Sequence, residues 1–169
     1  MEVMATGSVR RSQRADIDRP ARIVVAEDDF EMRRLVADCL RKEGYDVLEV
    51  ADGAELLLHV ENSLFLRHLL APADLFVTDI RMPVYSGLEI VGGMRDAGIE
   101  IPVVVMTAFG NAETRERAEQ LGAVLIEKPF KMAALRELVR RVLRRTVEID
   151  TGESNATSDC RWYGPDGSV

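Results

Sequence analysis

Short apolar runs alternate with segments of helical periodicity through the middle of the chain. The apolar runs are rich in Val, Ile and Leu and have the length of strands that are buried on both faces. They cover residues 22–27, 45–50, 74–78, 101–107 and 123–127. This alternation predicts five βα units, and therefore an α/β fold with a doubly wound, five-stranded parallel sheet. In such a fold the ligand site lies at the carboxyl ends of the strands.

Two of the intervening segments show helical periodicity clearly. In the first, apolar residues recur at helical spacing from Met32 to Leu40, and Gly44 favours an end to the helix. In the last, an apolar stripe runs from Met132 to Leu143, while arginines occupy the other faces and the final turn. Each of these helices is therefore predicted to bury one face against the sheet.

The length and the charge of the chain limit the possible functions. The chain has 169 residues, which allows one domain with terminal extensions, and we expect a flexible arm at 1–20, a domain at 21–145 and an acidic tail at 146–169. The net charge of −7 argues against direct binding to nucleic acid or to a membrane. No apolar run has the length of a membrane span or a signal-peptide core, so the expected location is the cytoplasm. Cys39 and Cys160 are expected to be reduced thiols.

Polar residues stand at the ends of four of the five predicted strands. They are Glu27, Asp28 and Asp29 at the end of the first strand, Asp79 at the end of the third, Thr107 at the end of the fourth and Lys128 directly after the fifth. Because the carboxyl ends of parallel strands meet at one edge of a sheet, these side chains are expected in a single crevice. Crowded carboxylates raise one another's pKa unless a cation neutralises them, and a few carboxylate oxygens in an open site suit Mg²⁺. We therefore expect a site for Mg²⁺, with Mn²⁺ as the alternative ion.

Four motifs at these positions together resemble the receiver domain of two-component response regulators. They read V-V-A-E-D-D at 24–29, T-D-I-R-M-P at 78–83 with Gly87 after it, V-V-V-M-T-A at 103–108, and E-K-P-F at 127–130. The resemblance spans 21–145 and implies a CheY-like, flavodoxin-like (βα)5 fold of the stand-alone type. It also implies a signalling protein that accepts a phosphoryl group from a sensor histidine kinase or histidine phosphotransfer protein, and then changes its binding to an unknown downstream protein.

The resemblance assigns roles to the three consecutive acids. The register is counted from Met32-Arg33, which is similar to a pair found early in the first helix of the family. It places the family's acidic pair on Glu27 and Asp28 and makes Asp29 the acid that starts the helix. Asp28 is then expected to bind the metal directly, and Glu27 to act through a water molecule.

The same correspondence makes Asp79 both a metal ligand and the phospho-acceptor, with the backbone carbonyl of Arg81 as the remaining protein ligand. The phosphoryl oxygens are expected to be neutralised by the metal, by the Lys128 ammonium and by the Thr107 hydroxyl with nearby amides. In the family, the threonine then moves and the surface of the fourth helix, fifth strand and fifth helix repacks. A homodimer through that surface is a further expectation.

Several positions depart from the family's usual pattern. Leu125 stands where an aromatic residue usually swings inward, so either Leu125 repacks more subtly or coupling runs mainly through Thr107 and the adjoining Ala108. Arg81 and Phe109 stand two positions beyond the acceptor and the threonine, where side chains tune the access of water to the phosphoryl group. Their bulk predicts slow autodephosphorylation. The apolar segment between the second and third strands is also longer than usual, which favours a longer buried helix over a partner surface.

Three other functions compete with a stand-alone signalling receiver, which would not be an enzyme acting on external substrates. The first is the receiver portion of a longer DNA-binding regulator. The second is a Mg²⁺-dependent phosphatase of the haloacid-dehalogenase type, which uses a similar Asp, Thr and Lys but requires an Asp-x-Asp pair, whereas Arg81 stands at that offset from Asp79. The third is nucleotide binding, which would require a Gly-rich loop where residues 27–30 stand.

Overall fold

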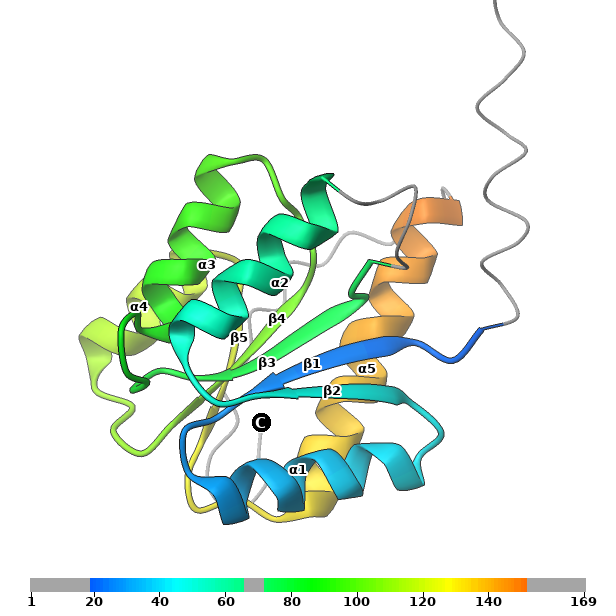
Figure 1. The fold of residues 1–169 in the computed structure, drawn as a ribbon, viewed down its shortest axis with the longest axis horizontal. Helices are drawn as coiled ribbons and strands as arrows, with labels where there is room; N and C mark the ends of the chain where they lie inside the picture. The colour runs from blue at the N-terminus through cyan, green and yellow to red at the C-terminus, as the bar shows by residue number, and fades with distance from the viewer. Residues whose placement is uncertain (1–18, 66–71, 152–169) are drawn as a thin grey trace, which may run out of the picture.

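The computed structural model describes residues 19–65 and 72–151, and Figure 1 shows their arrangement. The strands are β1 (Arg22–Ala26), β2 (Asp46–Val50), β3 (Leu75–Asp79), β4 (Val103–Thr107) and β5 (Val124–Glu127). The helices are α1 (Phe30–Lys42), α2 (Gly53–Phe65), α3 (Gly87–Asp96), α4 (Ala112–Gln120) and α5 (Met132–Thr151). Each strand is followed by one helix, as the alternating pattern predicts.

The five strands form one parallel sheet in the order β2-β1-β3-β4-β5. The predicted doubly wound α/β fold is therefore confirmed. The strand order reverses between β1 and β3, because the chain first moves outward to β2 and then crosses back. In sheets of this kind such a reversal opens a crevice at the carboxyl ends of the two strands, and ligands bind there.

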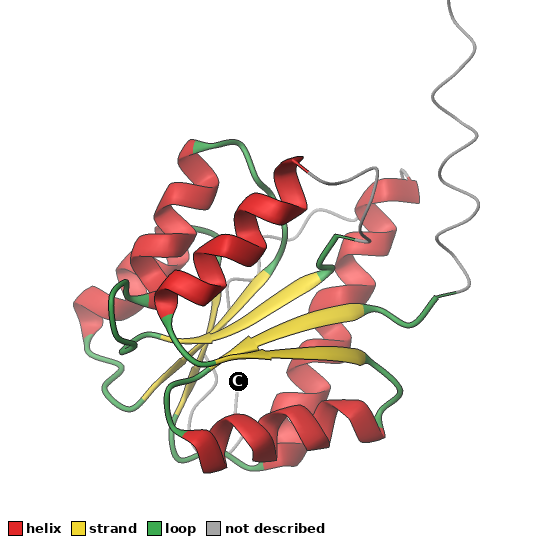
Figure 2. Cartoon of the chain, viewed as in Figure 1, coloured by secondary structure: helices red, strands yellow, loops and turns green. Residues whose placement is uncertain are grey.

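Helices cover both faces of the sheet in two layers. Figure 2 shows α1 and α5 on one face and α2, α3 and α4 on the other. Each face has its own apolar cluster, one built around Ile23, Leu40 and Leu135, the other around Phe76 and Leu56. Every residue of β3 and β4 is buried, and these central strands are apolar except for Thr78, Asp79 and Thr107 at their carboxyl ends.

Local signals set the starts of three helices. The side chain of Asp29 accepts a hydrogen bond from the Met32 amide at 2.7 Å, which makes Asp29 the cap of α1, as expected for the helix-starting acid. Ser86 and Glu89 form a capping box at α3, and the Asn111 side chain caps α4. These caps determine where the loops at the carboxyl end of the sheet stop and the helices begin.

Some expectations fall at the limits of the described residues. Helix α5 continues beyond Arg145 to Thr151, into the region expected to be a tail. Most of the arm and tail, with Cys160, lie outside the described residues, as does part of the apolar segment after α2; Cys39 is a half-buried free thiol. Within residues 19–65 and 72–151, none of the helices has the length and hydropathy needed to span a bilayer.

Candidate functional site

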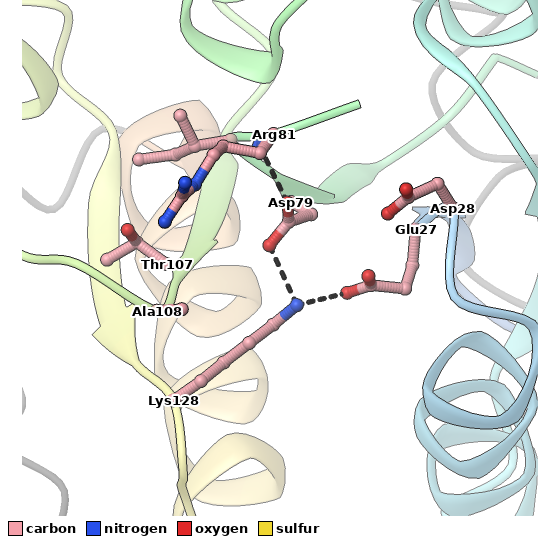
Figure 3. Close-up of a pocket in the computed structure, with 8 residues that line it drawn as sticks. Glu27, Asp28, Asp79, Arg81, Thr107, Ala108 and Lys128 are labelled. Atoms are coloured by element: carbon pink, nitrogen blue, oxygen red, sulfur yellow. Dashed lines mark hydrogen bonds and ion pairs between the residues drawn. The ribbon is translucent and has the colours of Figure 1, made fainter. Parts of the chain in front are cut away.

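Residues from four strand ends line one pocket at the carboxyl edge of the sheet. The pocket has a volume of about 220 Å³, and Figure 3 shows the side chains around it. Its lining consists of Glu27, Asp28, Asp79, Ile80, Arg81, Thr107, Ala108 and Lys128. The structure thus brings together the acids after β1, the acid at the end of β3, the threonine at the end of β4 and the lysine after β5, as the parallel topology predicts.

Three carboxylates meet in this pocket. One oxygen each from Glu27, Asp28 and Asp79 lies within 4.8 Å of the other two. Glu27 is 2% exposed and Asp79 is 6% exposed, whereas Asp28 faces solvent. The backbone amide of Glu27 donates to the carbonyl of Val50 at 3.2 Å. This hydrogen bond extends the β1–β2 pairing by one residue and fixes the position of the acidic residues at the end of β1.

Lys128 connects two of the three carboxylates, as the dashed lines in Figure 3 show. Its ammonium lies 2.7 Å from Asp79 Oδ1 and 2.5 Å from Glu27 Oε2. Burial lowers the pKa of Lys128, but the hydrogen bonds and charges of Asp79 and Glu27 outweigh this effect and raise the pKa above its ordinary value. Lys128 is therefore a permanent cation in the pocket at neutral pH.

The charge in the pocket is not balanced by Lys128 alone. Burial raises the pKa of Glu27, and the nearby charge of Asp79 raises it further, although the hydrogen bond from Lys128 lowers it. Three carboxylates face one ammonium, and all of their donor atoms are oxygens. This donor set, with Asp28 exposed to solvent, fits a hard divalent cation.

The backbone around Asp79 holds its carboxylate in place. Oδ2 of Asp79 accepts a hydrogen bond from the Arg81 amide at 2.6 Å, while Oδ1 faces Lys128. The hydroxyl of Thr78 donates to the Asp79 carbonyl at 3.0 Å. The structure thus places the Arg81 amide beside Asp79, and the expected role of the Arg81 carbonyl as a metal ligand stays a prediction.

The loop after β4 forms another wall of the pocket. Thr107 is 4% exposed, and its hydroxyl accepts a hydrogen bond from the Phe109 amide at 3.1 Å. The guanidinium of Arg81 lies 4.2 Å from the centre of the Phe109 ring, and this ring is otherwise largely exposed. A cation–π contact therefore joins the two bulky residues that follow Asp79 and Thr107.

Leu125, which stands where the family usually has an aromatic switch residue, is buried in the core. Leu125 is 5% exposed and belongs to the apolar cluster that packs under α2, α3 and α4. The side chain is already inside the core, so it has no exposed position from which to swing inward. Among the described residues of the pocket rim, Thr107 and Ala108 remain those expected to couple phosphorylation to the surface of α4, β5 and α5.

Two contributions to the site were not assigned from the sequence. The buried Thr78 hydroxyl supports the backbone at Asp79, and the guanidinium of Arg33 reaches the carbonyls of Glu27 and Asp28 from the first turn of α1. Arg33 was recognised only as a marker of register. A threonine before a strand-end aspartate and an arginine in a first helical turn are common features, and nothing in their spacing indicates these contacts.

Comparison with known proteins identifies the family. The sequence profile of the response regulator receiver domain matches residues 23–140. The chain belongs to this family and is a receiver of two-component signal transduction. Membership implies exchange of a phosphoryl group with histidine kinases or phosphotransfer proteins, and receivers typically bind a divalent metal.

Several relatives are similar over most of the chain. Transcriptional regulatory protein PdtaR of Mycobacterium tuberculosis is 32% identical to this chain. The match covers 85% of this chain and 67% of PdtaR. Sporulation initiation phosphotransferase F of Bacillus subtilis is 28% identical to this chain. The match covers 72% of this chain and 93% of the phosphotransferase. Response regulator MprA of Mycobacterium leprae is 33% identical over 81% of this chain, which spans only 57% of MprA. These relatives lend no support to the phosphatase alternative.

Solved structures share the fold. The receiver domain of the Francisella response regulator 1452 superposes with a TM-score of 0.65 at 25% identity and covers 75% of this chain and 98% of that domain. The chemotaxis protein CheY4 of Vibrio cholerae superposes with a TM-score of 0.63 at 27% identity. The match covers 73% of this chain and 98% of CheY4. The expected CheY-like fold is therefore confirmed.

Proposed function

We propose that Asp79 is the residue that accepts the phosphoryl group. The observation that carries this proposal is the position of Oδ1 of Asp79, 2.7 Å from the Lys128 ammonium and in the same pocket as the Glu27 and Asp28 carboxylates. Asp79 is buried and its carboxylate is held by hydrogen bonds, so little reorganisation is needed before attack.

Transfer from a phosphohistidine donor follows from this arrangement. An Asp79 oxygen forms a bond to phosphorus while the bond from phosphorus to the donor's imidazole nitrogen breaks, and that nitrogen keeps the electron pair. The Lys128 ammonium neutralises one phosphoryl oxygen, and the Thr107 hydroxyl and the loop amides after it provide donors for another. A divalent cation, when bound, supplies charge neutralisation at the remaining oxygen.

We assign the cation site to Asp28 and Asp79 as direct ligands, with the Arg81 carbonyl, and to Glu27 through water. Mg²⁺ is the proposed ion because the donors are few, all oxygen, and open to solvent on the Asp28 side, and Mn²⁺ would occupy the same site. Zn²⁺ is disfavoured because the cluster contains neither cysteine nor histidine.

Intact mass spectrometry tests the proposal. The full chain is incubated with a small acyl-phosphate donor and magnesium chloride, then with the same donor and a chelator, and the experiment is repeated on Asp79→Asn. We expect one added phosphoryl group on the parent chain, only with magnesium, and none on the variant, which keeps the shape of the side chain. A phosphoryl group on Asp79→Asn at the parental rate would contradict the assignment.

The output of the switch is proposed to be altered protein binding. Phosphorylation replaces the single negative charge of Asp79 with an acyl phosphate that carries about −1.5 to −2 charges beside Thr107, and this change is enough to bias two packings of the loop that leads to α4. The surface of α4, β5 and α5 is the proposed site for a downstream protein or for a second copy of this chain. We place this exchange in the cytoplasm, where the phosphorylated domains of its donors are expected.

The contact between Arg81 and Phe109 predicts a long-lived phosphorylated form. Arg81 lines the pocket and its guanidinium lies 4.2 Å from the centre of the Phe109 ring, so the two stacked side chains would hinder a water molecule that approaches phosphorus in line with the bond to be broken. Replacing both with alanine should accelerate autodephosphorylation about tenfold, a barrier change of about 1.4 kcal/mol.

The rate is measured from the loss of the added mass after the donor is removed. Leu48→Ala, a partly exposed apolar residue on the edge strand β2, is a control that should leave the lifetime unchanged. An unchanged lifetime in the double alanine variant would show that these side chains do not limit the access of water.

A further inference from the structure

The side chain of Arg33 lies directly behind the acidic loop that joins β1 to α1. Its Nη1 donates to the carbonyl of Glu27 at 2.6 Å and to the carbonyl of Asp28 at 3.3 Å. The side chain is only 13% exposed, and the shorter of these charge-assisted hydrogen bonds, to the Glu27 carbonyl, is partly buried, whereas the bond to the Asp28 carbonyl is open to solvent.

Two further contacts orient the guanidinium. Its Nε lies 3.8 Å from Oε2 of Glu49 in β2, and the group stands 5.5 Å from the centre of the Phe30 ring. Glu49 is itself held by Arg41 at 2.7 Å. Arg33 is therefore fixed from β2 on one side and from the start of α1 on the other.

We propose that Arg33 is a positioning residue for the metal site, acting through the backbone carbonyls of Glu27 and Asp28. This inference rests on the proposed cation site and extends it to a residue that does not touch the ion. Three carboxylates converge within 4.8 Å and Lys128 bridges only Glu27 and Asp79, so the remaining repulsion favours a loop position further from Asp79. By holding both carbonyls, Arg33 keeps the two side chains directed into the pocket.

The sign of the effect separates positioning from simple charge. Arg33 is a cation near a cation site, so by Coulomb's law alone its removal would strengthen metal binding. Loss of positioning acts in the opposite direction, because the ligands must then be ordered when the ion binds. Residues that orient metal ligands typically change affinity by about 10- to 100-fold when they are removed.

Calorimetric titration with magnesium chloride on the unphosphorylated full chain tests this. Arg33→Met keeps the apolar stem and removes the donors and the charge, and we expect it to weaken Mg²⁺ binding about tenfold. Arg33→Lys keeps the charge and one donor group and should recover part of the affinity. The matched control is Arg34→Met, which removes the same charge from the next residue, whose side chain is 65% exposed and faces Asp38. The affinity of Arg34→Met for Mg²⁺ should stay at or slightly above the parental value.

The outcomes distinguish this inference from the proposed function. If the parent chain binds no Mg²⁺, the metal site itself is wrong and the role of Arg33 falls with it. If the parent binds Mg²⁺ and Arg33→Met binds it equally or more tightly, the site stands and the positioning role is overturned. If Arg33→Met does not fold, Arg33→Lys decides: weakened binding supports the proposal, and parental binding overturns it.

Discussion

Replacing Lys128 with methionine should slow the transfer of a phosphoryl group to Asp79 by at least about 100-fold. Removing one preorganised donor from a site of developing negative charge typically costs two to three orders of magnitude in rate. Lys128 is also the ammonium that bridges Asp79 and Glu27 in the resting pocket. The rate is read from the growth of the phosphorylated mass in the presence of donor and magnesium.

The same variant should lose more stability relative to the parent at neutral pH than at acidic pH. The pKa of Glu27 is already raised by burial, and removing Lys128 takes away the hydrogen bond and the charge that lower it. A carboxyl with a raised pKa in the folded state holds its proton more tightly there than in the unfolded chain, so stability falls as the pH rises. The loss relative to the parent should be small near pH 4 and reach about 3 kcal/mol at pH 7.

Urea unfolding of the parent and of Lys128→Met at several pH values measures this difference. Magnesium chloride should restore part of the lost stability, because a bound cation neutralises the same carboxylates. Lys131→Met, a nearby exposed lysine, is the control and should change neither the rate nor the pH dependence. A loss of stability independent of pH would mean that Lys128 acts through packing rather than through its charge.

Replacing Gly87 with alanine should both destabilise the fold and impair phosphorylation. A β-carbon at Gly87 would lie 2.3 Å from the carbonyl oxygen of Asp79 and 2.8 Å from Thr78 Oγ1. The first of these contacts is with backbone, so the start of α3 must move away from the end of β3. We expect a loss of about 3 kcal/mol, at the upper end of the range for overpacked positions. Phosphorylation of Asp79 should slow because its backbone is displaced.

Gly93→Ala provides a matched control on the same helix. Its β-carbon would meet no atom within 4 Å, and alanine favours a helix more than glycine does, so this change should stabilise the protein by about 1 kcal/mol. Urea unfolding and the phosphorylation rate are measured for both variants. Equal behaviour of the two alanine variants would refute the close approach between α3 and the backbone of Asp79.

Much of the fold could be predicted because it depends on periodicity. The buried runs have strand length and the intervening stripes have helical spacing. Alternation of strands and helices along the chain favours a parallel sheet with helices on both faces. The same topology predicts that residues at the carboxyl ends of β1, β3, β4 and β5 meet, without knowledge of any distance. Asp29 as a helix cap was also predictable, because the contact from its side chain to Met32 is local.

Other features depend on how segments distant in the chain pack. The two-sided contact of Lys128, the carbonyl contacts of Arg33 and the stacking of Arg81 on Phe109 each require positions and rotamers that no spacing encodes. Helix α5 continues to Thr151, and composition does not indicate this continuation because the polar end of the helix is similar to a tail.

The residue types and their order along the chain thus determined the sheet, its helices and the group of acids, hydroxyl and amine at one edge, because hydrophobic periodicity and chain direction are local properties. Only the tertiary structure decided which of these groups share a proton donor, which face solvent, and which residue supports the acidic loop from behind. Those choices depend on distances of a few ångströms between segments far apart in sequence, and such distances are set when the two layers of helices pack onto the sheet.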